Sequence, residues 1–201
     1  IRNNLFKFDL DYFRPLGNPN KFIGGMLQHF SRLQDEDISP SDYLAWLKKQ
    51  KSKMDKGEWK KYNELASAYR TYDELKIKEG VMDFGDLITK TLKLFRDRPN
   101  VLKQYQNQFK YILVDEFQDT NYAQNELAIL LSGKAKNITV CGDDDQSVYR
   151  FRGAAVSNII FFRKTFQRIG KKIFIAMCKE GETSIIVLNC DYLLLRLSPH
   201  T

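Results

Sequence analysis

The sequence predicts an α/β protein in which a mainly helical part precedes a parallel sheet with helices. Two patterns carry this prediction. From Ser39 to about Gln108, segments with apolar residues at helical spacing follow one another. After Phe109, short apolar runs alternate with helical segments in the order strand, helix, strand, helix, which is typical of a parallel sheet. We therefore expect the chain to divide near residue 108.

The bulk composition is that of a folded protein with a basic surface. Hydrophobic residues make up 43% of the 201 residues and aromatic residues 13%, which is enough for a packed core. The formal net charge of +7 favours polyanionic partners, although an ordinary lysine-rich surface would give the same value. The chain begins with isoleucine rather than methionine, so we expect it to start inside a longer protein.

Cysteine spacing and hydropathy bear on the cellular compartment, on metal and disulfide sites, and on membrane spans. The three cysteines have no close spacing, so neither a zinc site nor a disulfide framework is indicated, and the pattern fits a reducing cytoplasm. No apolar run approaches the roughly 20 residues that cross a bilayer, so we expect no membrane span. No signal peptide is expected either.

In the first part, residues 1–38 are expected to be irregular because they are rich in proline and glycine. A helix is expected to start at Ser39-Pro40-Ser41, and a long amphipathic helix to run from Trp59 to Glu79. Gly80 can cap that helix. Further helices are expected from Asp83 and over 101–108.

In the second part, residues 109–114 and 137–141 form the apolar runs expected of buried parallel strands. Helices are expected over 121–131 and 153–166. Two further apolar runs, 173–177 and 185–188, are additional strand candidates.

Asp115 and Glu116 directly follow the first buried-strand pattern, so they are expected at the carboxyl end of the strand. That edge is where open α/β sheets bind ligands. One carboxylate there can hold Mg²⁺ while the other polarises a water for attack on a γ-phosphate. A solvated acidic turn is the alternative, and for this string alone it would be preferred.

The segment 139–154 adds a second set of candidates after the next strand. Gln146 can hydrogen-bond a phosphate oxygen or an attacking water while it remains uncharged. Tyr149, Phe151 and Arg152 combine aromatic faces with a guanidinium group, which suits stacking on unpaired bases beside phosphates. Ordinary core packing is the alternative for the two aromatic residues.

These strings resemble a known family. Residues 114–121 and 142–154 are similar to motifs II and III of superfamily 1 DNA helicases of the UvrD/Rep/PcrA type. Residues 83–88 resemble the Asp-Phe-x-Asp-Leu element that precedes motif II in that group. The resemblance implies a mainly helical 1B-like subdomain over 1–108, a partial RecA-like motor domain over 109–166, and a divergent tail over 167–201.

The resemblance also implies roles for single residues. Asp115 would contact the Mg²⁺ of Mg-ATP, Glu116 would be the catalytic base, and Gln146 would sense the γ-phosphate. Tyr149, Phe151 and Arg152 would touch single-stranded DNA.

Other residues of these motifs would have supporting roles. Asp119 and Thr120 would brace the site. For the element at 83–86, a helix cap with a buried phenylalanine at Phe84 explains the residues as well as a DNA-positioning role does.

The implied parent is an ATP-dependent DNA helicase or translocase that couples Mg-ATP hydrolysis to movement on single-stranded or forked DNA, as in DNA repair. The sequence contains no Gly-x-x-x-x-Gly-Lys-Ser/Thr phosphate loop and no second motor domain. We therefore expect the isolated chain to be inactive as an ATPase. Because the strand of the phosphate loop would lie beside the strand at 137–141, that strand should present an open edge.

Several alternatives remain open from the sequence. The chain could be a non-catalytic module that binds single-stranded DNA or a protein partner of unknown identity. It could also come from a helicase–nuclease fusion. Residues 167–201 either fold back onto the sheet or result from a frameshift or cloning scar, which we prefer. Reading the encoding DNA in all frames would separate these two origins of the tail.

Overall fold

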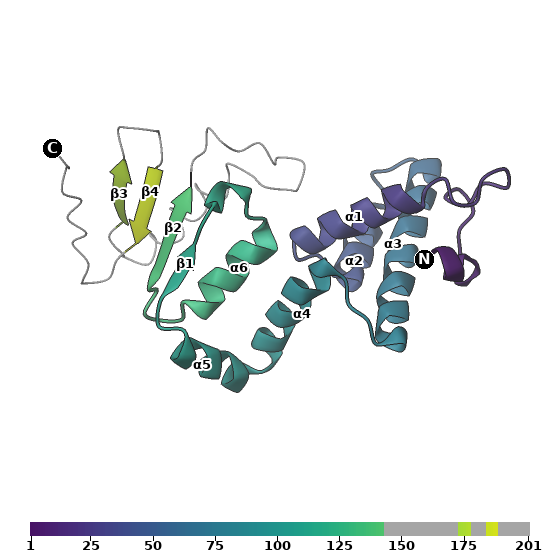
Figure 1. Cartoon of the computed structure of the whole chain (residues 1–201). Coiled ribbons are helices and arrows are strands. Elements are labelled where there is room, and N and C mark those ends of the chain that lie inside the picture. Colours follow the sequence, from purple (N-terminus) through teal and green to yellow (C-terminus); the bar gives the residue numbers. More distant parts are fainter. Residues whose placement is uncertain (143–172, 178–183, 189–201) are drawn as a thin grey trace. The chain divides into compact units, whose positions relative to one another are not determined.

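The computed structural model describes residues 1–142, 173–177 and 184–188 (Figure 1). The chain forms two compact units, Ile1–Thr89 and Lys90–Thr201. Helices occupy the chain up to Gln108 and strands begin at Ile112, as the sequence pattern predicts.

The first unit is built from helices. It contains η1 (Arg2–Lys7), α1 (Ile23–Asp35), α2 (Pro40–Gln50), α3 (Lys56–Glu79) and the first residues of α4 (Phe84–Asp97). Helices α2 and α3 pack against each other as a hairpin, and α1 lies beside them (Figure 1).

Capping residues mark the helix ends in the first unit. The predicted start at Ser39 and the predicted end at Gly80 are confirmed, whereas α3 begins at Lys56 rather than at the predicted Trp59. Ser39 begins α2 with a capping box, in which its hydroxyl and the Asp42 carboxylate each accept the other residue's backbone N–H. Asp55 caps α3 by accepting the backbone N–H groups of Gly57 and Glu58. Gly80 ends α3 in the left-handed region, at φ 65°, where glycine has no Cβ to clash.

Helix α1 corrects the expectation that residues 1–38 are irregular. Met26, Phe30 and Leu33 recur at helical spacing and are buried. The two glycines counted as breakers, Gly24 and Gly25, lie in the first turn of α1 with open space around them. The burial of the apolar stripe outweighs the low helix propensity of two glycines, about 1 kcal/mol each.

The core of the first unit is aromatic and is closed by one buried carboxylate. Phe30 stacks on Tyr69 and on Tyr72, with ring centroids 5.0 and 5.5 Å apart. Glu64 of α3 is buried and accepts three consecutive backbone N–H groups, from residues 11 to 13, at 2.8, 3.1 and 2.9 Å. These hydrogen bonds fix the segment before α1 against α3, because an unpaired buried carboxylate would be costly.

The second unit is an α/β structure. It contains α5 (Pro99–Gln108), β1 (Ile112–Val114), η2 (Phe117–Asp119), α6 (Tyr122–Leu131), β2 (Ile138–Gly142), β3 (Ile173–Met177) and β4 (Ser184–Leu188). The strand order is β1-β2-β4-β3. Strands β1 and β2 are parallel, as predicted, with Ile112 opposite Ile138 and Val114 opposite Val140.

The prediction that β2 has an open edge is wrong. Strand β2 has no open edge on its far side, because β4 pairs with it antiparallel, with Cys141 opposite Ile185. The sheet is therefore mixed rather than wholly parallel. Strand β3 pairs antiparallel with β4, and the bounds Met177 and Ser184 are too close in the chain for the crossover that a parallel pair needs. This pairing agrees with the alternative in which the tail folds back onto the sheet.

The prediction that β1 is a buried strand is also wrong. Strand β1 lies at the end of the strand order, and Leu113 is 77% exposed. Ile112 and Val114, which alternate with it, pack against a small core of Phe117, Ile138 and Val140. One face of β1 is thus covered by the core, and its other face is open within the part of the chain that the structure describes.

The helix predicted over 153–166 lies outside the described residues. None of the helices within the described ranges has the length and apolar character needed to cross a bilayer.

Candidate nucleotide-binding strand end and its helical partner unit

Asp115 and Glu116 lie where the sequence predicted them, immediately after β1, and both are exposed. Because β1 and β2 are parallel and Val114 is opposite Val140, their carboxyl ends share one edge of the sheet. Burial, and then the charge of Asp115, raises the pKa of the Cys141 thiol at the end of β2. The Asp115 carboxylate after β1 and the Cys141 thiol at the end of β2 therefore interact electrostatically at this edge.

The backbone at Glu116 is unusual. Glu116 has φ 48° and ψ 45°, in the left-handed region that non-glycine residues rarely adopt. Its backbone N–H donates to Asp115 Oδ1 at 3.0 Å. Such strain costs on the order of 1–3 kcal/mol and collects at functional sites. The sharp turn places two adjacent carboxylates at the solvent-exposed strand end.

The side chain of Phe117 anchors this turn to the small core of the second unit. Its side chain is buried against Ile138 and Val140, and its carbonyl accepts the Thr120 hydroxyl at 2.7 Å. Asn121 then begins α6 through a capping box with Gln124. The strand end is thus followed by a buried aromatic side chain and a capped helix.

Two polar side chains beside this turn lack hydrogen-bond partners. Within the described ranges, Asp119 Oδ1 and both side-chain amide atoms of Asn125 are buried without a partner. Buried polar atoms without partners are rare in folded proteins, because each one costs free energy. The bracing role expected of Asp119 stays a prediction.

The carboxylates of Asp115 and Glu116 suit Mg²⁺ better than a metal ion that is held by several protein side chains. Among the described residues, no three histidine, cysteine or acidic side chains gather into a group that would hold a metal ion. Mg²⁺ typically takes one or two carboxylates and completes its shell with phosphate oxygens and water. The exposed Asp115 carboxylate, next to Glu116, matches that requirement.

The remaining predicted site residues, Gln146, Tyr149, Phe151 and Arg152, lie outside the described residues. Their roles stay predictions from the sequence.

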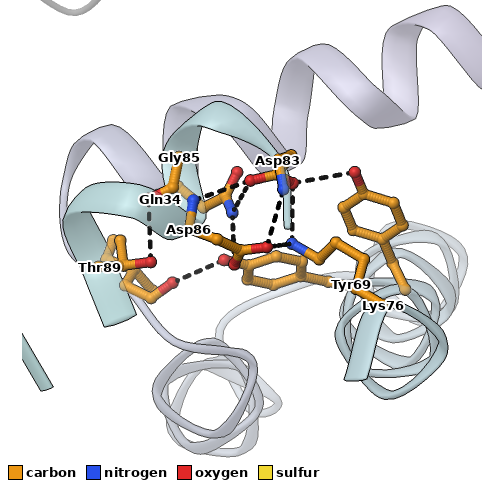
Figure 2. Close-up of polar contacts among 9 residues, drawn as sticks. Gln34, Tyr69, Lys76, Asp83, Gly85, Asp86 and Thr89 are labelled. Atoms are coloured by element: carbon orange, nitrogen blue, oxygen red, sulfur yellow. Dashed lines mark hydrogen bonds and ion pairs between the residues drawn. The ribbon is translucent and has the colours of Figure 1, made fainter. Parts of the chain in front are cut away.

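In the first unit, Asp83 and Asp86 form a buried polar network (Figure 2). Asp83 Oδ1 accepts the backbone N–H of Asp86 at 2.8 Å, and Asp86 Oδ2 accepts that of Asp83 at 3.2 Å, so the two residues cap α4 reciprocally. Lys76 of α3 forms ion pairs with Asp83 at 2.8 Å and with Asp86 at 2.6 Å. The Lys76 and Asp86 side chains are only 7% and 3% exposed.

Two further side chains complete the network. Gln34 of α1 donates to Asp83 at 3.0 Å and to Asp86 at 3.3 Å, and the Tyr72 hydroxyl donates to Asp83 at 2.9 Å. Burial by itself would raise the pKa of Asp83, but hydrogen bonds from Lys76, the Asp86 backbone and Tyr72 together hold it below the usual value. The network ties α1, α3 and the start of α4 together (Figure 2).

This arrangement separates the two explanations offered for residues 83–86. The helix cap is present, but Phe84 is 91% exposed, so the expected buried phenylalanine is wrong. The sequence reasoning missed Gln34 and Lys76. Lys76 continues the stripe of the buried Tyr69 and the partly buried Tyr72 on α3, and a lysine in such a stripe indicates a buried ion pair.

These features define an α/β protein with an acidic strand end and a helical unit in the same chain. The chain belongs to the UvrD/REP helicase N-terminal domain family, whose model matches residues 6–167. The match includes the strand end, the capped element at Asp83 and the helical unit.

Curated relatives agree with this assignment. Over 148 residues the chain is 40% identical to the ATP-dependent DNA helicase PcrA of Staphylococcus aureus strain Mu50, which covers 74% of this chain and 18% of that protein. Over 168 residues it is 39% identical to the ATP-dependent DNA helicase PcrA of Staphylococcus epidermidis strain RP62A, which covers 84% of this chain and 21% of that protein. The chain thus spans about a fifth of the length of these relatives.

Proposed function

We propose that this chain is part of an ATP-dependent DNA helicase or translocase that couples Mg-ATP hydrolysis to movement on single-stranded or forked DNA. The observation that carries the proposal is the pair of exposed, adjacent carboxylates at the shared edge of β1 and β2. Membership of the UvrD/REP family and the printed name of the relatives support it.

In this proposal the two carboxylates divide the chemistry. Asp115 is the magnesium ligand, because it lies at the strand end where the phosphates of a nucleotide would be bound. Glu116 is the general base that takes a proton from the attacking water. Its left-handed backbone breaks the strand geometry after Asp115, which supports separate roles for the two carboxylates. Gln146 senses the γ-phosphate.

The DNA contacts are proposed for the segment after β2. Tyr149 and Phe151 stack on unpaired bases, and Arg152 contacts the phosphates beside them. We assign residues 109–166 to a partial RecA-like motor domain and residues 1–108 to a 1B-like subdomain that returns to the motor at α4.

For the isolated chain of 201 residues we propose DNA binding without ATP turnover, because its sequence contains no phosphate loop. A fluorescent single-stranded oligonucleotide should bind in a salt-dependent manner. Tyr149→Ala/Phe151→Ala should weaken binding by about 1–3 kcal/mol per ring, as expected for base stacking. Phe6→Ala/Tyr111→Ala is the matched control, since these aromatic side chains are also exposed, at 90% and 73%.

Three results would contradict this proposal. Equal loss of binding in both double variants would remove the DNA role of the predicted segment. Magnesium-dependent ATP hydrolysis by the isolated chain, abolished by Glu116→Gln, would show that it is not inactive. Binding of a protein partner with no affinity for DNA would favour the alternative of a non-catalytic partner-binding module.

A further inference from the structure

The second edge of β2 is covered by a strand from the tail of the chain. Strand β4 pairs with β2 antiparallel, with Val187 opposite Thr139 and Ser184 opposite Gly142. It also pairs antiparallel with β3 over its whole length, from Ser184 to Leu188. Strand β4 is therefore an interior strand with backbone partners on both sides, in the strand order β1-β2-β4-β3.

The direction of β4 decides what it can contribute to the acidic strand end. Its first residue, Ser184, is opposite Gly142, the last residue of β2. The amino end of β4 thus lies at the sheet edge where Asp115 follows β1, and its carboxyl end lies at the opposite edge. A phosphate loop follows the carboxyl end of its strand, because the loop and the helix after it present their backbone N–H groups to the phosphates. Strand β4 therefore cannot bring such a loop to Asp115 and Glu116.

The place that β4 occupies is the one that the proposed motor needs for its phosphate-loop strand. In that motor the loop strand runs parallel to β2, along the edge of β2 that β4 covers. A strand has two edges for backbone hydrogen bonds, and β2 uses its other edge for β1. Because one edge of β2 pairs with one strand at a time, β4 and a loop strand exclude each other.

Two features favour β4 in this competition. Antiparallel pairing is slightly more stable per residue than parallel pairing. The connection between β3 and β4 is also short, since β3 ends at Met177 and β4 begins at Ser184, and closing a short loop costs less conformational entropy than closing a long one. The 201 residues contain no phosphate loop, so a loop strand from elsewhere in a longer chain would have to close a longer connection.

We infer that β4 is an autoinhibitory strand, which excludes the phosphate-loop strand from the sheet while it is paired with β2. The inference rests on the proposed function, because it requires a phosphate loop elsewhere in the full-length protein. The apparent affinity for a ligand falls in proportion to the fraction of molecules that are competent to bind it. Pairing of β4 therefore lowers the apparent affinity for Mg-ATP without altering the carboxylates that carry out the chemistry.

The test uses two substitutions at Ile186, which is opposite Val140 of β2 and Ile175 of β3. Ile186→Pro removes a backbone N–H and is incompatible with a strand that has partners on both sides. Ile186→Val is the matched control, because it keeps the backbone N–H and a β-branched side chain.

The first measurement is amide hydrogen exchange of the 201-residue chain, followed by mass spectrometry. Ile186→Pro should increase exchange in Thr139–Gly142, whereas Ile186→Val should not, and α6 should keep its protection in both variants. Unchanged exchange in Thr139–Gly142 of the proline variant would overturn the inference, because β4 would then not cover this edge. Loss of protection in α6 would also overturn it, because β4 would then be required for the fold rather than replaceable.

The second measurement is steady-state hydrolysis of Mg-ATP by the full-length protein to which the chain belongs, in the presence of single-stranded DNA. Ile186→Pro should lower KM for Mg-ATP by about fivefold or more with kcat unchanged, the result expected if β4 is paired in at least about 80% of the molecules. Ile186→Val should leave both constants unchanged.

An unchanged or raised KM in the proline variant, or a loss of hydrolysis confined to it, would overturn this inference and leave the proposed function standing. Absence of hydrolysis in the original protein and in both variants would remove the proposed function itself.

Discussion

Gly85 lies against the side chain of Gln34, which donates to both aspartates of the buried network (Figure 2). A Cβ at position 85 would fall 2.5 Å from Gln34 Oε1 and 2.9 Å from Gln34 Cβ. The end of a flexible side chain can move, but Gln34 Cβ is fixed to the backbone of α1. Glycine at this position therefore lets Gln34 reach the start of α4.

We predict that Gly85→Ala lowers the free energy of unfolding of the first unit by about 1–3 kcal/mol, the usual cost of overpacking. Gly25→Ala is the control, because it adds the same methyl group inside a helix where nothing lies within 4 Å. That change should stabilise the unit by about 0.5–1 kcal/mol. Both tryptophans lie in the first unit, so urea unfolding followed by tryptophan fluorescence reports on it alone. Two variants of the same sign would refute this account of Gly85.

At the residue scale, the sequence predicted some features and not others. The positions of Asp115 and Glu116 at a strand end follow from the apolar run before them. The left-handed backbone of Glu116 does not, because glutamate has no preference for that region. The exposure of Phe84 was also missed, since the capping pattern of Asp83 and Asp86 fixes the helix start without fixing which face is buried.

At the element scale, the start of α4 depends on a carboxylate whose pKa is lowered in the folded protein. In the unfolded chain an aspartate titrates near 3.9. A lowered folded pKa stabilises the fold at pH values above the unfolded value, and this contribution is lost as the pH falls through the folded value. The first unit should therefore lose stability below about pH 4.

We predict that Asp83→Asn makes the acid loss of stability shallower and also lowers stability at neutral pH, where the ion pair with Lys76 is broken. Asp9→Asn should leave the acid loss unchanged, since Asp9 is exposed. The measurement is the urea midpoint by tryptophan fluorescence at pH 7, 4.5 and 3. An acid loss in Asp83→Asn as steep as in the original chain would show that other groups control it.

The elements also show where sequence patterns are sufficient. Helices α2 and α6 begin at Ser39 and Asn121, and α3 ends at Gly80, all of them capping residues that the sequence displays, so these bounds were predicted closely. Helix α1 was missed because two glycines near its start were read as breakers, although the apolar stripe that follows them is buried. Local propensity was outweighed there by tertiary burial.

Strand pairing was the least predictable feature. The apolar runs gave β1, β2, β3 and β4 as strands, but a run of apolar residues does not state its partner or its direction. The sequence analysis expected an open edge on β2, because the chain contains no phosphate-loop strand. That edge is instead covered by β4, a later segment of the same chain, which pairs with β2 antiparallel.

At the scale of the whole molecule, the chain combines a helical unit, held by aromatic stacking and a buried ion network, with an α/β unit that carries an acidic strand end. In the proposed motor, the strand end is the part that binds Mg-ATP. The chain spans about a fifth of the length of its relatives.

The proposal that Glu116 is the base for ATP hydrolysis is tested most directly in the full-length protein to which this chain belongs. The measurement is steady-state hydrolysis of Mg-ATP in the presence of single-stranded DNA, compared between the original protein and Glu116→Gln. We expect the rate constant to fall by about 10²–10⁴, the usual contribution of a general base, with DNA binding retained. An unchanged hydrolysis rate in a folded Glu116→Gln protein would contradict the account.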